Sequence, residues 1–254
     1  NIFVLFYTLN LFTILLSQDY WGGTSVSTPD NLSAVTQNPA GLGIHRGEQS
    51  GIYFALDSLS TWSSSYRSNG FGYDLTYNKS TNNFLNPFDG NIAFGFQVFK
   101  NAYSGIKWNK RNKYDFGFLY RPLNFISFGA VLQTNDNLDQ YIQSKFGLSI
   151  RPFLKHRLTI GADINSLNND DSLYIHPHFA IEAIDGINLN FSSNIDFTNF
   201  QINLGFTFGK ANIYSPANIN SNNNISGGIG FYSDTQIKSS IFNKNIKDKQ
   251  KYIR

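Results

Sequence analysis

The chain has 254 residues, with many aromatic side chains (16%), few charged ones (15%) and no cysteine or methionine. This length suits one large β domain or two smaller ones, and the composition is too polar for a bundle of membrane helices and too aromatic for a disordered chain. The small net charge of +3 and the missing cysteines argue against nucleic acid as a partner, a disulfide framework and thiolate chemistry.

The chain begins with "NIFVLFYTLNLFTILLSQ", in which residues 2–16 are apolar and uncharged. This run is shorter than the roughly 20 residues that a comfortable membrane-spanning helix needs. We therefore interpret residues 1–18 as a truncated secretory signal that has lost its basic start and its Met, with cleavage near Ser17 and Gln18. An uncut membrane anchor helix is the alternative.

From about residue 51 onward, apolar and polar residues alternate with a period of two. In "NIAFGFQVF", Ile92, Phe94, Phe96 and Val98 fall on one face, and "RLTIGADI" and "FQINLGFTFG" follow the same rule. Clusters rich in Asn, Asp and Gly separate these runs, as is typical of turns between strands. A weak hairpin repeat places Arg-Pro pairs 30 residues apart, at residues 121–122 and 151–152. The pattern predicts an all-β, antiparallel, up-and-down arrangement of about 14 strands over residues 47–242.

The chemistry of the two strand faces favours a transmembrane β-barrel. The apolar faces are broad, aromatic and almost free of charge, as is expected where strands meet lipid. The opposite faces mix small polar residues with charges of both signs, which can form networks inside a lumen. We expect these side chains to line that lumen: Lys145, Arg151, Arg157, Asp163, His176, His178 and Glu182.

Aromatic residues near the strand ends agree with this prediction. Trp108, Tyr114, Tyr120 and Tyr141 have the positions expected of the girdles that flank a membrane. With an export signal and no second apolar run that could span as a helix, the outer membrane of a two-membrane bacterium is the expected location, with its lipid as a partner. A soluble, secreted β domain that acts as a binding module is the alternative.

The stretch "GGTSVSTPDNLSAVTQNPAGLGIHRG" at residues 22–47 resembles the N-terminal segment of the long-chain fatty acid transporter family (FadL-like) and of the related PorV-like secretion-system barrels. The likeness is concentrated in the motif Asn38, Pro39, Ala40, Gly41 and Leu42. It implies a 14-stranded barrel whose N-terminal segment, residues 19–46, sits in the lumen as a hatch. Pro39 fixes its own φ and moves Asn38 out of helical geometry, which suits a rigid turn.

The resemblance implies passage of hydrophobic small molecules or a scaffold role for a partner protein or domain. The loops of this chain are short, which leaves little room for a dedicated apolar site. Residues 227–254 also resemble the link between a barrel and an SppA-type signal peptide peptidase, with residues 243–254 as a basic linker to a following domain. In that alternative the catalytic residues would lie beyond Arg254.

No catalytic motif is found in the chain, and we expect neither an enzyme nor a cofactor. His176 and His178 are two apart and point to the same side of a strand, a spacing that metals can use. No third ligand is identifiable, so lumen lining is the preferred interpretation. His45, His156 and the pair Asp170 and Asp171 are expected in loops or at the rim.

Overall fold

The computed structural model describes Trp21 and residues 23–44, 47–56, 61–78, 88–110, 113–135, 141–153, 158–168, 170–220 and 225–236, with only the backbone of residues 170–172. The expected signal and basic linker lie outside these residues, as do Asp19, Tyr20, His45, Arg46 and Arg157. Among the described residues, no helix has both the length and the apolar character to cross a bilayer.

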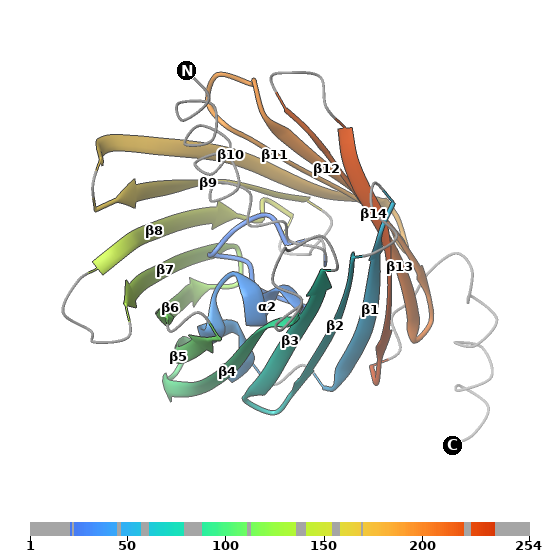
Figure 1. Ribbon diagram of the computed structural model, residues 1–254, viewed down its shortest axis with the longest axis horizontal. Helices are drawn as coiled ribbons and strands as arrows, with labels where there is room; N and C mark the ends of the chain where they lie inside the picture. The colour runs from blue at the N-terminus through green and yellow to red at the C-terminus, as the bar shows by residue number, and fades with distance from the viewer. Residues whose placement is uncertain are drawn as a thin grey trace.

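The described strands close into one antiparallel barrel, in which each strand pairs with its neighbours in sequence and β1 pairs with β14 (Figure 1). The strands are β1 (Gln49–Ala55), β2 (Thr61–Ser68), β3 (Phe71–Asn78), β4 (Phe88–Phe99), β5 (Ala102–Asn109), β6 (Lys113–Leu123), β7 (Ile126–Asn135), β8 (Tyr141–Ile150), β9 (Leu158–Leu167), β10 (Asp170–Ile184), β11 (Ile187–Ser193), β12 (Phe200–Phe208), β13 (Ala211–Ile219) and β14 (Ile225–Asp234). The predicted all-β, up-and-down barrel of about 14 strands is confirmed.

The alternation seen in the sequence becomes an outer and an inner face. On β4, Phe94 and Phe96 are 51% and 57% exposed. Ala93, which precedes Phe94 and points to the opposite face, is fully buried. Phe116 and Phe118 on β6 repeat the pattern. A continuous apolar surface of this kind is rare on a protein in water but is the expected lipid-facing band of a membrane barrel. These rows do not pack against a second sheet anywhere in the described residues, which removes the main argument for a soluble sandwich.

The two ends of the barrel differ in their connections. At one end, tight turns join most of the strands, for example Asn69–Gly70 between β2 and β3, where both residues have positive φ. The start of β1 and the end of β14 meet at this end through the Gln49–Asp234 pair. We call this end the short-turn end, and the other the long-loop end. Residues 194–199, for example, connect β11 and β12 there.

Three of the four aromatic residues named from the sequence lie at the long-loop end. Trp108 is opposite Tyr114 across β5 and β6, and Tyr141 begins β8. Tyr120 is opposite Ala102, toward the short-turn end. Trp108, Tyr120 and Tyr141 are exposed on the outer face. Their placement at both ends of the apolar band fits the predicted girdles.

The N-terminal segment, defined here as Trp21 and residues 23–44, lies within the ring of strands (Figure 1). It contains a short α-helix, α2 (Ser33–Thr36), and a 3₁₀-helix, η1 (Pro39–Gly43). Helix α2 contacts β3 and β4, and η1 contacts β4, β5 and β6. Both clusters of buried apolar side chains found in the described residues join this segment to the inner wall.

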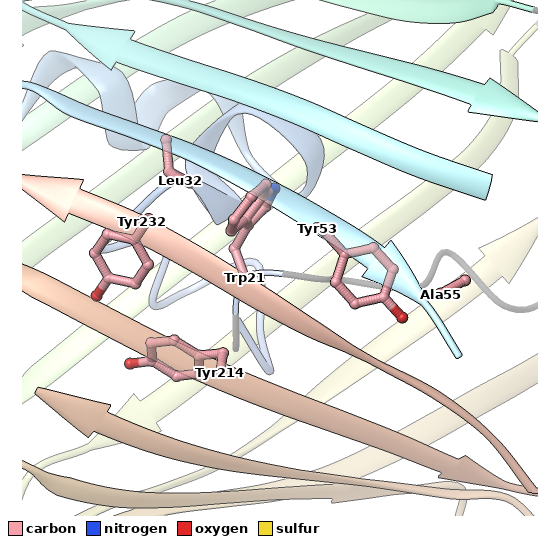
Figure 2. Close-up of a cluster of buried hydrophobic side chains, with 6 residues drawn as sticks. All are labelled: Trp21, Leu32, Tyr53, Ala55, Tyr214 and Tyr232. Carbon is pink, nitrogen blue, oxygen red and sulfur yellow. The ribbon is translucent and has the colours of Figure 1, made fainter. Parts of the chain in front are cut away.

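One such contact is an aromatic cluster beside β1, β13 and β14 (Figure 2). Trp21 and Leu32 of the N-terminal segment meet Tyr53, Tyr214 and Tyr232 of the wall. The rings of Tyr214 and Tyr232 stack at 5.5 Å. Burial of large aromatic rings contributes several kcal/mol in total at about 25 cal/mol per Å² of apolar area. This cluster holds the beginning of the segment against the wall.

Candidate functional site in the lumen

In the Asn-Pro-Ala-Gly-Leu motif, Asn38 is the N-cap of η1 and the next four residues are its first four, and all five are buried. Asn38 is extended (φ −148°, ψ 106°), as expected for a residue before proline, and Pro39 occupies the first helical turn. The Asn38 side chain accepts a hydrogen bond from the backbone N–H of Ala40 (3.1 Å) through Oδ1. Its Nδ2 donates to the carbonyl oxygens of Val26 (2.7 Å) and Phe118 (3.1 Å). One amide thus caps η1, braces the segment and ties it to β6.

Glycines on the inner wall provide the space in which the segment lies. Gly95, Gly105 and Gly117 are directly opposite one another across β4, β5 and β6. A Cβ added at Gly105 would collide with the backbone of Pro39, and one at Gly117 would collide with Asn38 Oδ1. Any side chain in this row would push η1 off the wall.

A second pair of opposed glycines, Gly129 and Gly147, lies across β7 and β8. A Cβ at Gly129 would collide with the carbonyl of Val26, and one at Gly147 would lie 2.9 Å from Val26 Cγ2. The wall is therefore shaped to receive two separate parts of the segment, around Val26 and around η1. Close backbone approach is one of the few reasons for a glycine within a strand.

Charged and polar groups of the wall bind the segment as well. Asp30 is paired with both Arg121 and Arg151, with Oδ1 lying 2.6 Å from the Arg121 guanidinium. Arg67 is almost fully buried and donates to the carbonyls of Asn31 and Ile44, each at 3.0 Å. Buried charges are stable only when paired and hydrogen-bonded, and the segment provides part of that pairing here.

The segment is held by a third group of polar contacts around Asp163. Its carboxylate accepts from Ser25 Oγ (2.5 Å) and from the backbone N–H of Val26 (2.9 Å). Ser27 continues the network, with its Oγ 2.5 Å from that of Ser149. On another part of the wall, Lys107 donates a hydrogen bond to the carbonyl oxygen of Thr36 in the segment (2.8 Å). It also forms an ion pair with Asp115 (2.5 Å). The wall thus contacts the segment from several strands.

The residues predicted to line the lumen have different surroundings. Asp163 and His178 are buried on the inner face, and the His178 ring lies 3.0 Å from Ser149 Oγ. Arg151 follows β8 and is paired with Asp30. Glu182 accepts from the backbone N–H of Gly186 (2.7 Å) and so holds the turn after β10. Lys145 and His176 border a cavity, and Arg157 lies outside the described residues.

The cavity has a volume of about 200 Å³ and lies between the N-terminal segment and the wall from β8 to β14. Gly23, Thr24, Val26 and Gln37 come from the segment. Most of the remaining lining is polar, including Lys145, Asp163, Asn165, His176, Ser193, Asn199, Gln201, Asn218 and Ser226. Several of these residues lie near strand ends that face the long-loop end. Most of the residues around the cavity are therefore polar.

Metal and nucleophile chemistry have little support here. In the described part of the chain, no three His, Cys, Asp or Glu side chains are grouped as metal ligands. The two histidines have separate surroundings, since His178 meets Ser149 and His176 borders the cavity. The Ser149–His178 pair has the distance of a nucleophile and its base, but Ser149 is 1% exposed and is covered by Ser27 of the segment.

The sequence reasoning missed most of the residues that join the segment to the wall: Asp30 on the segment, and Arg67, Lys107, Arg121 and the two sets of glycines on the wall. One signal was available, because the glycines occupy the inward positions of the period-two pattern. Their partners lie in a different part of the chain, so the pattern alone did not reveal what they accommodate.

Comparison with known proteins gives a likeness in fold. The chain resembles the TodX deltaS2S3 mutant, described as a monoaromatic hydrocarbon channel, with a TM-score of 0.55 and 10% identity over 80% of this chain and 94% of that one. A triple mutant of Rhodopseudomonas blastica porin gives a TM-score of 0.45 and 9% identity over 74% and 97% of the two chains. No protein-family model matches the chain. No curated protein matches it in sequence.

Proposed function

We propose that the protein is an outer-membrane β-barrel channel in which the N-terminal segment acts as a hatch, and that solutes cross when the hatch is displaced. The observation that carries this proposal is the fit of the segment to the wall. Two sets of opposed glycines make room for it, and Asp30, Asn38 and Asp163 join it to strands far away in the sequence. In an empty lumen these positions could carry side chains, because most of the atoms that a Cβ would meet there belong to the segment.

The outer membrane follows from the outward apolar band together with the export signal expected at residues 1–18. A closed barrel satisfies all backbone groups between strands and is, besides the helix, the only structure that can span lipid. The inner face, by contrast, is polar and carries charges of both signs. Such a lumen holds water wherever the hatch does not fill it.

The FadL-like and PorV-like resemblance supports the hatch more than it supports a hydrophobic substrate. The burial of Asn38–Leu42 inside the barrel supports the hatch that this resemblance implies. The largest apolar contact inside the barrel, around Trp21, is filled by the protein's own side chains. The cavity is lined mainly by amides, hydroxyls and charged groups. We therefore retain the hatch as the part of this resemblance that the geometry supports best.

A reversible crosslink tests the hatch. The native chain has no cysteine, so an introduced pair reacts only with itself. Ser27 Oγ on the segment lies 2.5 Å from Ser149 Oγ on β8, close to the 2.05 Å of a disulfide bond. The double variant Ser27→Cys/Ser149→Cys should therefore lock the segment to the wall when oxidised. The matched control is Ser63→Cys/Thr76→Cys, which joins β2 and β3 through hydroxyls 3.1 Å apart and leaves the segment free.

The measurement is conductance in planar bilayers and solute-driven swelling of proteoliposomes. Oxidised Ser27→Cys/Ser149→Cys should suppress opening events, and a reductant should restore them. The oxidised control pair should open like the parent. Deletion of residues 23–44 should give a permanently higher conductance. If the deletion leaves conductance unchanged, the segment does not close the lumen and the proposal fails.

A further inference from the structure

The Arg-Pro repeat of the sequence brings two arginines together at the short-turn end of the barrel. Arg121 lies near the end of β6 and Arg151 directly follows β8, and these two strands lie on either side of β7. Both guanidinium groups reach the carboxylate of Asp30 on the N-terminal segment, and each takes one of its two oxygens. The repeat therefore places the same residue at equivalent positions of two hairpins, where a single carboxylate joins them.

Residues of the wall orient both arginines independently of the segment. Arg121 Nε donates to Ser127 Oγ on β7 (3.1 Å), and Arg151 Nε donates to Thr159 Oγ1 on β9 (3.4 Å). The Nη2 groups are the ones that meet Asp30. Donors that are already oriented lose less conformational entropy when they bind a ligand. The arginine pair should therefore keep its geometry when the segment, and Asp30 with it, leaves the wall.

The charge of the pair indicates what could replace Asp30. Guanidinium groups match the planar oxygens of a carboxylate and bind it more strongly than they bind a neutral group. The two arginines carry two positive charges and Asp30 carries one negative charge, so the three groups together have a net charge of +1. The pair would repel a cation, and a hydrocarbon offers it no acceptor. A solute with carboxylate groups satisfies both arginines.

Water reaches this contact from outside. The side chains of Arg121 and Arg151 are 15% and 10% exposed, and that of Asp30 is 19% exposed. Arg67, which also binds the segment at the short-turn end, is by contrast only 2% exposed. A dissolved carboxylate can therefore approach Arg121 and Arg151 as Asp30 moves away.

We propose that Arg121 and Arg151 form a binding site for a small, water-soluble carboxylate solute, and that Asp30 occupies this site while the hatch is closed. The assignment names the solute class of the proposed channel and rests on the proposed function for the route through the lumen. The solute and Asp30 compete for the same guanidinium groups, so the solute stabilises the displaced segment. The open lumen also presents both positive charges to passing ions, which favours anions.

The test measures how succinate changes the accessibility of a buried thiol in the full chain. Ser33 is fully buried in the segment and the native chain has no cysteine, so a maleimide labels Ser33→Cys only when the segment leaves the wall. A ligand that binds only the undocked state multiplies its population by 1 + [L]/Kd. The labelling rate should therefore rise linearly with succinate and double at a concentration equal to the Kd of the free arginine pair. Sodium chloride at the same ionic strength, which screens charges without supplying a carboxylate, should have a smaller effect.

Two double variants in the Ser33→Cys background connect the effect to the arginine pair. Arg121→Gln/Arg151→Gln removes the pair, so succinate and sodium chloride should change its labelling rate equally. Lys100→Gln/Lys210→Gln is the matched control, because it removes two positive charges from exposed turns at the same end of the barrel. It should respond to succinate like the parent. Each rate is compared with the same variant's rate without succinate, and a heat-modifiable gel shift verifies that each variant is folded.

Ion selectivity gives a second measurement. In a potassium chloride gradient across a planar bilayer, the reversal potential of Arg121→Gln/Arg151→Gln should shift from that of the parent toward a preference for potassium. Lys100→Gln/Lys210→Gln should shift less.

Two results would overturn the assignment: equal effects of succinate and sodium chloride on the parent, or an undiminished response to succinate in Arg121→Gln/Arg151→Gln. Labelling requires no ion flow, so it tests the carboxylate site even if the bilayer shows no openings. Failure of this assignment is therefore distinguishable from failure of the channel itself.

Discussion

Replacing Asn38 by alanine should loosen the N-terminal segment without damaging the barrel. The Asn38 side chain makes three hydrogen bonds, to Ala40, Val26 and Phe118, and is fully buried. Only the bond to Phe118 joins the segment to the wall, so at a net value of about 1 kcal/mol for this bond the variant loses about 1 kcal/mol of docking free energy. Since 1.4 kcal/mol is a factor of ten, the undocked population should rise by about fivefold.

A buried cysteine reports the undocked population. Ser33 is fully buried in α2 and its Oγ has no hydrogen-bond partner, so Ser33→Cys is a nearly isosteric reporter in a chain without other thiols. A maleimide reacts with this thiol only when the segment leaves the wall. When opening and closing are fast relative to labelling, the labelling rate follows the opening equilibrium. Ser33→Cys/Asn38→Ala should therefore react about fivefold faster than Ser33→Cys alone.

The control is the neighbouring residue. Gln37 Oε1 has no partner, so Ser33→Cys/Gln37→Ala should label at the parent rate. All proteins should keep the heat-modifiable migration of a folded barrel, which separates undocking from unfolding. An unchanged labelling rate in Ser33→Cys/Asn38→Ala would refute the claim that this amide anchors the segment.

Three further predictions use the same reporter or the same gel assay. Gly105→Ala should increase labelling strongly, because its Cβ would lie 2.6 Å from the backbone N of Ala40, whereas Gly90→Ala, whose Cβ would meet its neighbours at 3.4 Å or more, should not. Asp30→Asn should weaken the docking free energy of the segment by about 3 kcal/mol, because it leaves Arg121 and Arg151 without their carboxylate. Since these charges are partly exposed, added salt should reduce the difference in labelling rate between this variant and the parent. Phe94→Arg places a charge on the lipid face at a cost of about 2–4 kcal/mol near the membrane centre, so less of this variant should reach the heat-modifiable form.

Some features of the site were accessible from the sequence, because they depend on neighbours in the chain. The extended geometry of Asn38 follows from Pro39, and its bond to Ala40 joins residues two apart. The inward direction of Asp163 and His178 follows from the period-two pattern of their strands. Each of these needs only local backbone geometry.

Other features joined residues that no local rule connects. Asp30 meets Arg151 across 121 positions, and Ser25 meets Asp163 across 138. Arg151 was expected to line the lumen, but the pattern could not identify Asp30 as its partner. The His176–His178 pair shows the reverse, since two residues close in sequence have different surroundings because one faces Ser149 and the other the cavity.

The strands, their two faces and their up-and-down order could be predicted from the residues alone, because side chains alternate along every strand and each strand pairs with the next one. The resting place of the N-terminal segment, the glycines that admit it and the cavity beside it could be seen only in the folded barrel. Those outcomes depend on shapes and charges that come together only once β14 has paired with β1 and the lumen exists.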